Sequence, residues 1–186
     1  MKKITEYLHY LPAASEPLSA DVFVITGEKQ TYLFDVGRKA EAFQLLSELP
    51  GEKTVVLSHF HKDHTENLDR LTYKNLYVGD CTFEKLGKGT VVTDHLTIRD
   101  GVKLDIQSCP SPHTPGSLIL TVNNEYTLLA DLYFTRPDYD RHATRAMLEV
   151  LEKLDTKYFV VSHQEGSPVF EKAFLLEELK KYFRLS

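Results

Sequence analysis

Short runs of aliphatic, β-branched and aromatic residues recur along the chain, and most of them are bounded by Gly, Asn, Asp or Pro. Side chains of these kinds fit a pleated, half-buried surface, so such runs are typical of β-strands. We therefore predict strands at residues 22–26, 31–34, 54–57, 75–78, 102–107, 118–122, 127–130 and 157–161. Tight turns at residues 27–30 and 123–125 are expected to close two antiparallel hairpins.

Three longer segments repeat apolar residues with the spacing of an amphipathic helix. Residues 142–154, for example, place Met147, Leu148 and Leu151 on one face. Residues 39–49 and 170–183 have the same spacing, and these three segments are predicted to be helices. Strands and helices that alternate in this way predict a mixed α/β domain with many hairpins.

The two halves of the chain repeat one order of elements. In the first half a hairpin ends at Asp35, and a helix and a strand then lead to a Ser-His pair at His59. In the second half a hairpin ends at Asp131, and a helix and a strand lead to a second Ser-His pair at His163. We interpret this order as two related half-domains. If the halves face each other, both aspartates and both histidines meet at one edge, where polar groups of layered α/β folds gather around ligands.

Length and composition are those of an ordinary globular domain. With 186 residues, of which 42% are hydrophobic and 26% charged, residues 1–186 are expected to form a single domain. No apolar run approaches the roughly 20 residues that span a bilayer, and the first residues lack the apolar core of a signal peptide. Two cysteines, Cys81 and Cys109, cannot form a disulfide framework. We therefore expect a soluble, cytoplasmic protein.

The net charge of the chain is −5 at pH 7. Nucleic-acid-binding proteins usually carry a basic stripe, and the richest basic cluster here is expected to be the solvated face of the last helix. The charge therefore disfavours nucleic acid and the membrane surface as partners, and the expected partner is a small-molecule substrate.

The most distinctive cluster directly follows the predicted strand 54–57. His59, His61, Asp63 and His64 lie within six residues, although the chain has only eight histidines. Alternate residues of an extended chain point the same way, so two of these imidazoles can face one point. Imidazole and carboxylate groups are the ligands of Zn²⁺ and related divalent metals. The cluster therefore predicts a metal site.

The pattern His-x-His-x-Asp-His after an apolar strand resembles the first motif of the metallo-β-lactamase superfamily, and the resemblance extends along nearly the whole chain. Four further motifs match in the family's order: Phe34-Asp-Val-Gly37, Ser111-Pro-His-Thr-Pro-Gly-Ser117, Leu128-Leu-Ala-Asp131 and Val160-Val-Ser-His163. The string His-Thr-Pro-Gly is especially similar to glyoxalase II and its relatives. The resemblance implies an α/β fold, a four-layer αββα sandwich of two related half-domains, with a dinuclear metal site between the sheets.

The resemblance also implies residue roles. It assigns seven metal ligands, one of which bridges the two ions. One ion is held by His59, His61 and His113, the other by Asp63, His64 and His163, and Asp131 binds both. Asp63 is further expected to act in catalysis by orienting or deprotonating the nucleophile. Asp35 is expected to orient a ligand rather than to bind metal. The ions are expected to be two Zn²⁺, with Fe and Mn as alternatives.

The expected function is a metal-dependent hydrolase, in which a metal-bridging hydroxide attacks a small ester, thioester or lactone. The glyoxalase II-like motifs favour thioesters. Only 23 residues follow His163, so we expect no C-terminal helical domain like the one with which glyoxalase II holds glutathione. Two alternatives stay open: a mononuclear iron enzyme similar to persulfide dioxygenases, and a non-catalytic metal-binding module.

Two expectations concern the mouth of the site. Residues 81–100 and 133–141 are expected to be loops that shape it. A chain this short has few elements to cover a pocket, so a homodimer in which a second subunit completes the pocket is also expected.

Overall fold

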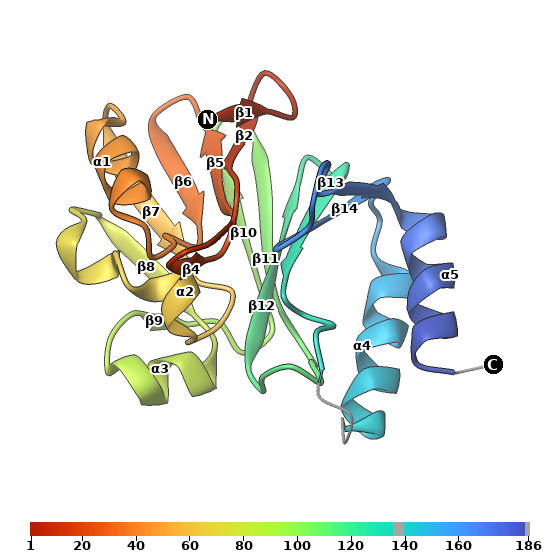
Figure 1. Ribbon diagram of the computed structural model, residues 1–186. Helices are drawn as coiled ribbons and strands as arrows, with labels where there is room; N and C mark the ends of the chain where they lie inside the picture. The colour runs from red at the N-terminus through yellow and green to blue at the C-terminus, as the bar shows by residue number, and fades with distance from the viewer. Residues whose placement is uncertain (136–139, 185–186) are drawn as a thin grey trace.

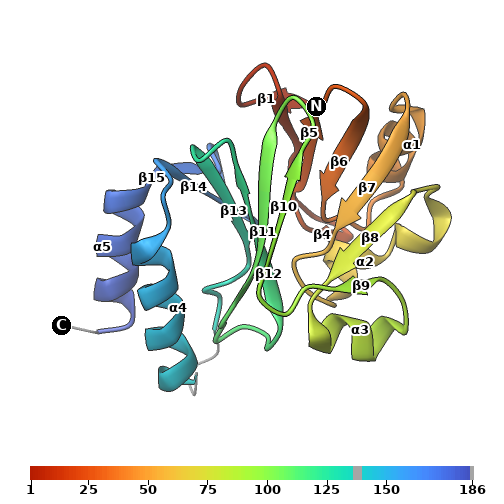
Figure 2. The same cartoon turned by 180° about the vertical axis from the view of Figure 1, so that it is seen from behind.

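The structure of the chain is a computed structural model that describes residues 1–135 and 140–184. Two β-sheets lie face to face at its centre, and helices cover the outer side of each sheet (Figures 1 and 2). The helices of the first side are α1 (Ala40–Glu48), α2 (Lys62–Thr65) and α3 (Asp80–Leu86), and those of the second are α4 (Arg141–Lys153) and α5 (Lys172–Tyr182). This order of layers confirms the predicted αββα sandwich.

The first sheet is built from the N-terminal half of the chain. Its neighbouring strands are β1 (Lys2–Lys3), β2 (Leu8–Leu11), β5 (Val22–Thr26), β6 (Gln30–Phe34), β7 (Glu52–Val56), β8 (Asn75–Val78) and β9 (Thr90–Val91). A separate small hairpin, β3 (Ala14–Ser15) and β4 (Leu18–Ser19), precedes β5, and a short 3-10 helix (Leu68–Arg70) follows α2.

The second sheet is built from the C-terminal half. Its strands, in spatial order, are β10 (His95–Arg99), β11 (Lys103–Cys109), β12 (Ser117–Val122), β13 (Tyr126–Ala130), β14 (Tyr158–Val161) and β15 (Val169–Glu171). In the part of the chain that the structure describes, no helix is both long and apolar enough to cross a bilayer.

The two halves repeat one topology, as the sequence predicts. In the first half β5 pairs antiparallel with β6, and α1 then crosses over to β7, which lies parallel to β6. In the second half β12 pairs antiparallel with β13, and β14 lies parallel to β13. Because each crossover returns the chain in the same direction, the carboxyl ends of β6 and β7 lie at one edge, as do those of β13 and β14. These edges carry the polar motifs.

Three apolar clusters fill the spaces between the four layers. Between the sheets, Phe23 and Phe34 pack with residues of the second sheet such as Leu120. On the outer side of the first sheet, Leu46 of α1 belongs to a second cluster, and Met147 of α4 belongs to a third on the outer side of the second sheet. These side chains are fully buried, and each such burial contributes about 1.5–3 kcal/mol. The packing holds both sheet edges in fixed positions.

Several elements differ from the sequence prediction. Residues 81–100 are not a loop, because they contain most of α3, β9 and β10. β10 lies at the edge of its sheet and alternates exposed with half-buried positions, so it lacks the apolar run of a buried strand. α5 begins at Lys172 rather than at residue 170, because Val169–Glu171 pairs with β14 as a strand. Part of the predicted loop 133–141, residues 136–139, lies outside the described residues.

Candidate metal centre

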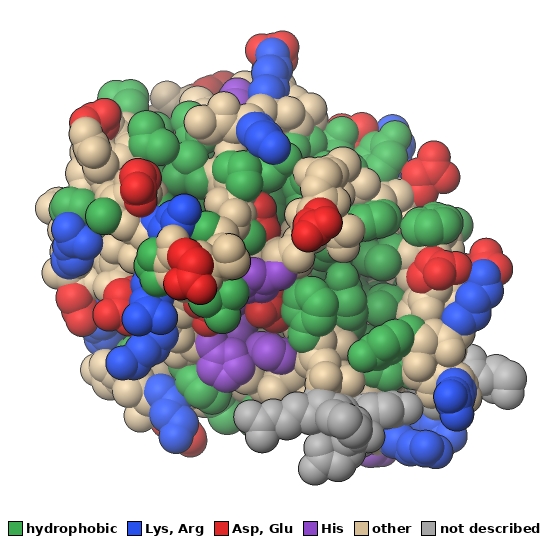
Figure 3. Space-filling view, viewed as in Figure 1, with side chains coloured by type: hydrophobic (Ala, Val, Ile, Leu, Met, Phe, Trp, Pro, Cys, Tyr) green, Lys and Arg blue, Asp and Glu red, His purple; other side chains and the backbone are tan. Residues whose placement is uncertain are grey.

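The seven predicted ligands lie after the carboxyl ends of strands or in the short helix α2. His59 and His61 follow β7, whereas Asp63 and His64 lie in the short helix α2. The other three follow strands of the second sheet: His113 after β11, Asp131 after β13 and His163 after β14. Histidine side chains with acidic groups among them gather on one face of the molecule (Figure 3). The fold thus brings residues from both halves to one place.

The seven side chains form two groups that could each hold an ion. The histidine group consists of His59, His61 and His113, and the mixed group consists of Asp63, His64, Asp131 and His163. Within each group the donor atoms lie within 4.8 Å of one another. The distance from His61 Nδ1 is 3.0 Å to His59 Nε2 and 3.1 Å to His113 Nε2. A tetrahedral ion with bonds of about 2.0–2.1 Å holds its nitrogen ligands about 3.3 Å apart, which these separations approach.

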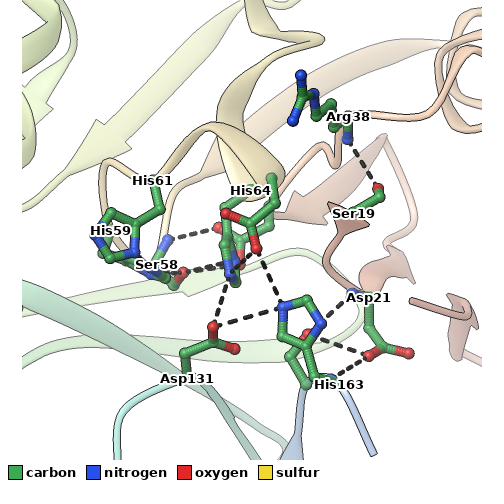
Figure 4. Close-up of polar contacts among 12 residues, drawn as sticks. Ser19, Asp21, Arg38, Ser58, His59, His61, His64, Asp131 and His163 are labelled. Atoms are coloured by element: carbon green, nitrogen blue, oxygen red, sulfur yellow. Dashed lines mark hydrogen bonds and ion pairs between the residues drawn. The ribbon is translucent and has the colours of Figure 1, made fainter. Parts of the chain in front are cut away.

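Asp131 lies between the two groups. Its Oδ2 is 3.3 Å from His64 Nε2 and 3.5 Å from His163 Nε2 within the mixed group (Figure 4). The same oxygen is 3.9 Å from His113 Nε2 of the histidine group. A carboxylate in this position can reach ions held by either group.

A buried network fixes which nitrogen of His59 and His64 faces the centre. Asp35 accepts hydrogen bonds from the Ser58 hydroxyl at 2.8 Å and from His64 Nδ1 at 2.7 Å. Because the Ser58 proton goes to Asp35, the Ser58 oxygen accepts from His59 Nδ1 at 2.9 Å. Both Nδ1 atoms therefore carry a proton, so Nε2 is the nitrogen of each ring that faces the centre and can bind a metal. Asp35 thus holds His64 directly and His59 through Ser58, which is the arrangement that the predicted orienting role requires.

His113 is oriented by a separate contact. Its Nδ1 donates to the backbone carbonyl of Phe134 at 2.9 Å, so that its Nε2 faces His61. The hydroxyl of Ser111 accepts the backbone N–H of His113 at 3.0 Å and holds the turn. His61 differs from the other histidines because it presents Nδ1 rather than Nε2 to its group.

Two buried polar atoms test whether a cation fits. His64 Nε2 and Asp131 Oδ1 have no hydrogen-bond partner among the described residues. Leaving a buried polar atom unpaired costs about 1–3 kcal/mol, so native proteins rarely do so without a ligand. A lone pair and a carboxylate oxygen are both donors to a divalent ion, and neither needs a proton from the protein. The residues present therefore fit a divalent metal.

The electrostatics of the two groups are opposite. In the histidine group, burial and the neighbouring histidines lower the pKa of His59 far below its usual value, and burial lowers the pKa of His61 and His113. These rings are therefore neutral at pH 7. In the mixed group burial also opposes charge, but Asp35 and Asp131 raise the pKa of His64 to about 10. This excess of negative charge favours a cation, which competes with the proton on His64.

The backbone is in an unusual conformation at three of the strand ends. Asp35, Ala130 and His163 have φ angles of 62°, 49° and 57°, in the left-handed region that costs an ordinary residue about 1–2 kcal/mol. Such conformations persist only where surrounding contacts impose them, and they cluster at functional sites. Here they turn the chain sharply at the point where each half delivers its polar side chains.

Three residues close to the ligands were not assigned from the sequence. Ser58 and Ser162 precede the two histidines His59 and His163, and their repetition as Ser-His pairs was the available signal. Asp21 is 3% exposed and accepts the backbone N–H of His163 at 2.9 Å. The sequence around it carries no pattern that distinguishes it from a turn residue.

The remaining sequence expectations concern residues away from the ligands. Cys109 is buried in the outer cluster of the second sheet, as expected for a small apolar residue, and burial raises the pKa of its thiol to about 12. His95 lies on β10, where its half-exposed ring is 3.3 Å from Asp105. Neither residue belongs to the two metal-ligand groups.

A cavity of about 450 Å³ adjoins the mixed group. It is lined by His163 and Asp21, by the small hairpin around Leu18, and by the charged residues Lys2 and Glu165. The ring of Phe134 also lies near His163, with the two ring centroids 6.4 Å apart. The cavity therefore reaches the centre at one predicted ligand, His163.

Known structures share this architecture. The sequence matches no protein-family model and no curated protein. A metallo-β-lactamase superfamily protein from Sulfolobus tokodaii superimposes with a TM-score of 0.69 at 18% identity, covering 98% of this chain and 88% of that chain. A metallo-β-lactamase from Pontibacter korlensis gives 0.72 at 17% identity over 100% and 98% of the two chains. A metallo-β-lactamase family protein from Thermus thermophilus gives 0.72 at 17% identity over 98% and 81%. The chain therefore has the metallo-β-lactamase fold.

Proposed function

We propose that this chain is a metal-dependent hydrolase of the metallo-β-lactamase superfamily that acts on a small ester, thioester or lactone. The observation that carries the proposal is the convergence of two ligand groups, with Asp131 Oδ2 within 3.9 Å of donors in both. A structural metal site needs one closed set of ligands, whereas two adjacent sets that approach one carboxylate suit catalysis. The shared fold supports the same assignment.

Each group is assigned one divalent ion, and Zn²⁺ is proposed for both. The histidine group offers three neutral imidazoles, and the mixed group offers two imidazoles and two carboxylates, one of them from Asp131. Zn²⁺ accepts both sets of donors, and Fe or Mn would accept the mixed group as well. Bound ions of this kind lower the pKa of a coordinated water towards neutrality and polarise the attacked carbonyl.

The chain's own residues orient these donors and handle the proton. Asp35 and Ser58 direct the Nε2 atoms of His59 and His64 towards the centre, so that the donors are in place before an ion binds. Asp63 is assigned the catalytic role. Its side chain is 15% exposed, and its Oδ2 lies 3.2 Å from His163 Nε2. Burial by itself would raise the pKa of Asp63, but the hydrogen bond from His163 and the neighbouring His64 together lower it below its usual value. The group is therefore ionised at pH 7 and can accept a proton.

The surroundings favour a small substrate with an apolar part. The cavity of about 450 Å³ beside His163 is within the size range of small-molecule sites. Phe134 and Tyr133, whose ring centroids are 4.9 Å apart, supply a half-buried aromatic wall next to the mixed group. The glyoxalase II-like string at His113 is the basis for preferring thioesters within this class.

Elemental analysis and substrate turnover test this proposal together. Protein purified without added metal should contain about two divalent ions per chain, and it should hydrolyse at least one member of a panel of thioesters, esters and lactones. One tightly bound iron with persulfide oxidation instead of hydrolysis would replace the proposal by a mononuclear dioxygenase. Two bound ions with no turnover on any substrate would replace it by a metal-binding module.

The other expectations from the sequence stay predictions. They are a single domain, a homodimer that completes the pocket, a cytoplasmic location, and the absence of nucleic-acid and membrane partners.

A further inference from the structure

The segment that precedes β5 contacts residues of the mixed group from both halves of the chain. The Ala20 N–H donates to the carbonyl oxygen of Asp63 at 3.0 Å. The next residue, Asp21, accepts the backbone N–H of His163 at 2.9 Å, so that its carboxylate lies against the histidine (Figure 4). Asp63 and His163 are 100 residues apart in the chain, and their side chains meet at 3.2 Å. Residues 20–21 therefore connect the two sides of this contact.

Asp21 is buried, and every hydrogen bond recorded for its carboxylate comes from a backbone N–H or from Ser162. Its Oδ1 accepts from the Ala13 N–H at 3.1 Å, and its Oδ2 accepts from the Ser162 hydroxyl at 3.1 Å as well as from His163. Its own N–H donates to Ser162 Oγ at 2.9 Å. The carboxylate is 3% exposed and belongs to neither metal-ligand group. Burying a charge in this way is costly unless hydrogen bonds compensate it.

The hydrogen bond from His163 to Asp21 is made by a residue whose backbone conformation is unfavourable by itself. His163 has a φ of 57°, which disfavours any residue with a β-carbon. In this conformation the His163 N–H points to Asp21, while its ring reaches Asp63 and Asp131. Without the carboxylate, His163 could relax to negative φ, and its ring would turn away from the mixed group.

We propose that Asp21 is a positioning residue that sets the affinity of the mixed group for its metal ion, by holding the backbone of His163 in the conformation that directs the ring at Asp63. The inference rests on the proposed metal centre. It concerns one of the two groups only, because among the described residues no hydrogen bond joins Asp21 to a ligand of the histidine group.

The histidine group has its own supports. His113 is fixed by Phe134 and Ser111, and His59 is fixed by Ser58. None of these hydrogen bonds involves Asp21 or Ser162. Loss of Asp21 should therefore release the ion of the mixed group and leave the ion of the histidine group bound.

Zinc titration of purified variants tests this directly. The metal is removed from four proteins: wild type, Asp21→Ala, Asp21→Asn and Ser162→Ala. Their Zn²⁺ affinities are then measured by competition with a chromophoric chelator, and their metal content by elemental analysis after dialysis. Residues that support metal ligands typically contribute about 10–100-fold to affinity. We expect Asp21→Ala to lower the affinity for one of the two ions by this factor and to leave the affinity for the other unchanged. Asp21→Asn keeps one acceptor oxygen for the His163 N–H and should lose less.

Asp100 provides the matched control. It is 7% exposed and accepts backbone N–H groups of Lys29 and Gln30 at the turn between β5 and β6, at the opposite end of β6 from Asp35. Asp100→Asn should lower the thermal midpoint without changing either zinc affinity.

The outcomes separate the inference from the proposed function. Wild type that binds fewer than two Zn²⁺ would overturn the dinuclear centre itself. Wild type with two ions and a folded Asp21→Ala with both affinities unchanged would overturn the role of Asp21. If Asp21→Ala does not fold, Asp21→Asn and Ser162→Ala decide the question. Unchanged Zn²⁺ affinities in both of these variants would refute the inference. An equal loss of Zn²⁺ affinity in the control Asp100→Asn would also refute it.

Discussion

Replacing Asp131 by alanine should abolish hydrolysis while leaving the metal-free fold nearly intact. The Asp131 carboxylate lies among donors of both groups, 3.3 Å from His64 Nε2, 3.5 Å from His163 Nε2 and 3.9 Å from His113 Nε2. Asp131→Ala therefore removes a ligand from either ion that this side chain reaches. The substitution also leaves the positive charge of the bound metal less compensated, and both effects weaken metal binding.

The magnitude differs between the metal-free and the metal-bound protein. In the metal-free protein Asp131 Oδ1 has no hydrogen-bond partner among the described residues, whereas Oδ2 lies 3.3 Å from His64 Nε2 and 3.5 Å from His163 Nε2. The substitution leaves these two imidazoles without that partner and should lower the free energy of unfolding by about 1–3 kcal/mol. Metal binding should weaken by at least about 100-fold, the upper range for a residue that only supports a ligand. At saturating metal this removes about 2.7 kcal/mol of stabilisation, or about 5–11 °C of thermal midpoint for a domain of this size.

Thermal unfolding with and without Zn²⁺ measures both numbers, and turnover is followed on the substrate that the panel identifies. His95→Ala is the control, because His95 lies on β10 outside both groups. It should keep two ions, wild-type turnover and a midpoint within a few degrees of wild type. The reasoning fails if Asp131→Ala keeps both ions and normal turnover, or if His95→Ala is the inactive variant.

Three further predictions follow from other parts of the structure. Removal of metal with a chelator should abolish turnover and lower the thermal midpoint, and Zn²⁺ should restore both; full activity in metal-free protein would contradict the assignment. Gly79→Ala should weaken zinc binding by the histidine group in chelator competition, because a Cβ at Gly79 would lie 1.8 Å from the carbonyl oxygen of Gly116 in the His113 turn. Gly87→Ala is the control: its Cβ meets no described atom within 4 Å, and its cost is the backbone strain of a φ of 69°, so it should lower stability and leave zinc binding unchanged. Burial raises the pKa of Cys109 from 9.0 to about 12, so the folded state holds this proton more tightly than the unfolded chain, and its contribution to stability is lost as the pH rises from 9 towards 12. The free energy of unfolding, measured with urea at several pH values in this range, should fall less steeply with pH for Cys109→Ala than for wild type. An identical dependence on pH in the two proteins would show that the thiol does not ionise there.

Local sequence patterns determined most of the elements that form the layers. The strands β5, β6, β12 and β13 and the helices α1 and α4 lie within one or two residues of their predicted ranges, because each carries an apolar pattern that few other conformations could bury. The motif from His59 to His64 was equally readable, since four candidate ligands within six residues form a local signal. The repeated order of elements also indicated that the two halves would pair.

The edge strands and the short helix α3 were less predictable from the sequence. β10 and β15 are edge strands with few buried residues, and their assignment depends on the neighbours with which they pair. α3 has a single buried residue, Thr82, so its sequence carries no apolar stripe. In such elements the partner strand or the capping turn supplies the stabilisation, and neither is visible in a local pattern.

The geometry of the centre was decided by tertiary structure alone. The resemblance named His113, Asp131 and His163, but only the packing of the two sheets places their donor atoms beside those of the first motif. The nitrogen that each histidine presents depends on the partner of its other nitrogen, and that partner comes from elsewhere in the chain, as Asp35 does for His64. Asp21 had no sequence signal, since its role arises from a backbone N–H more than a hundred residues away. Hydrogen bonds between distant segments form only once the core has fixed both, so a local pattern cannot encode them.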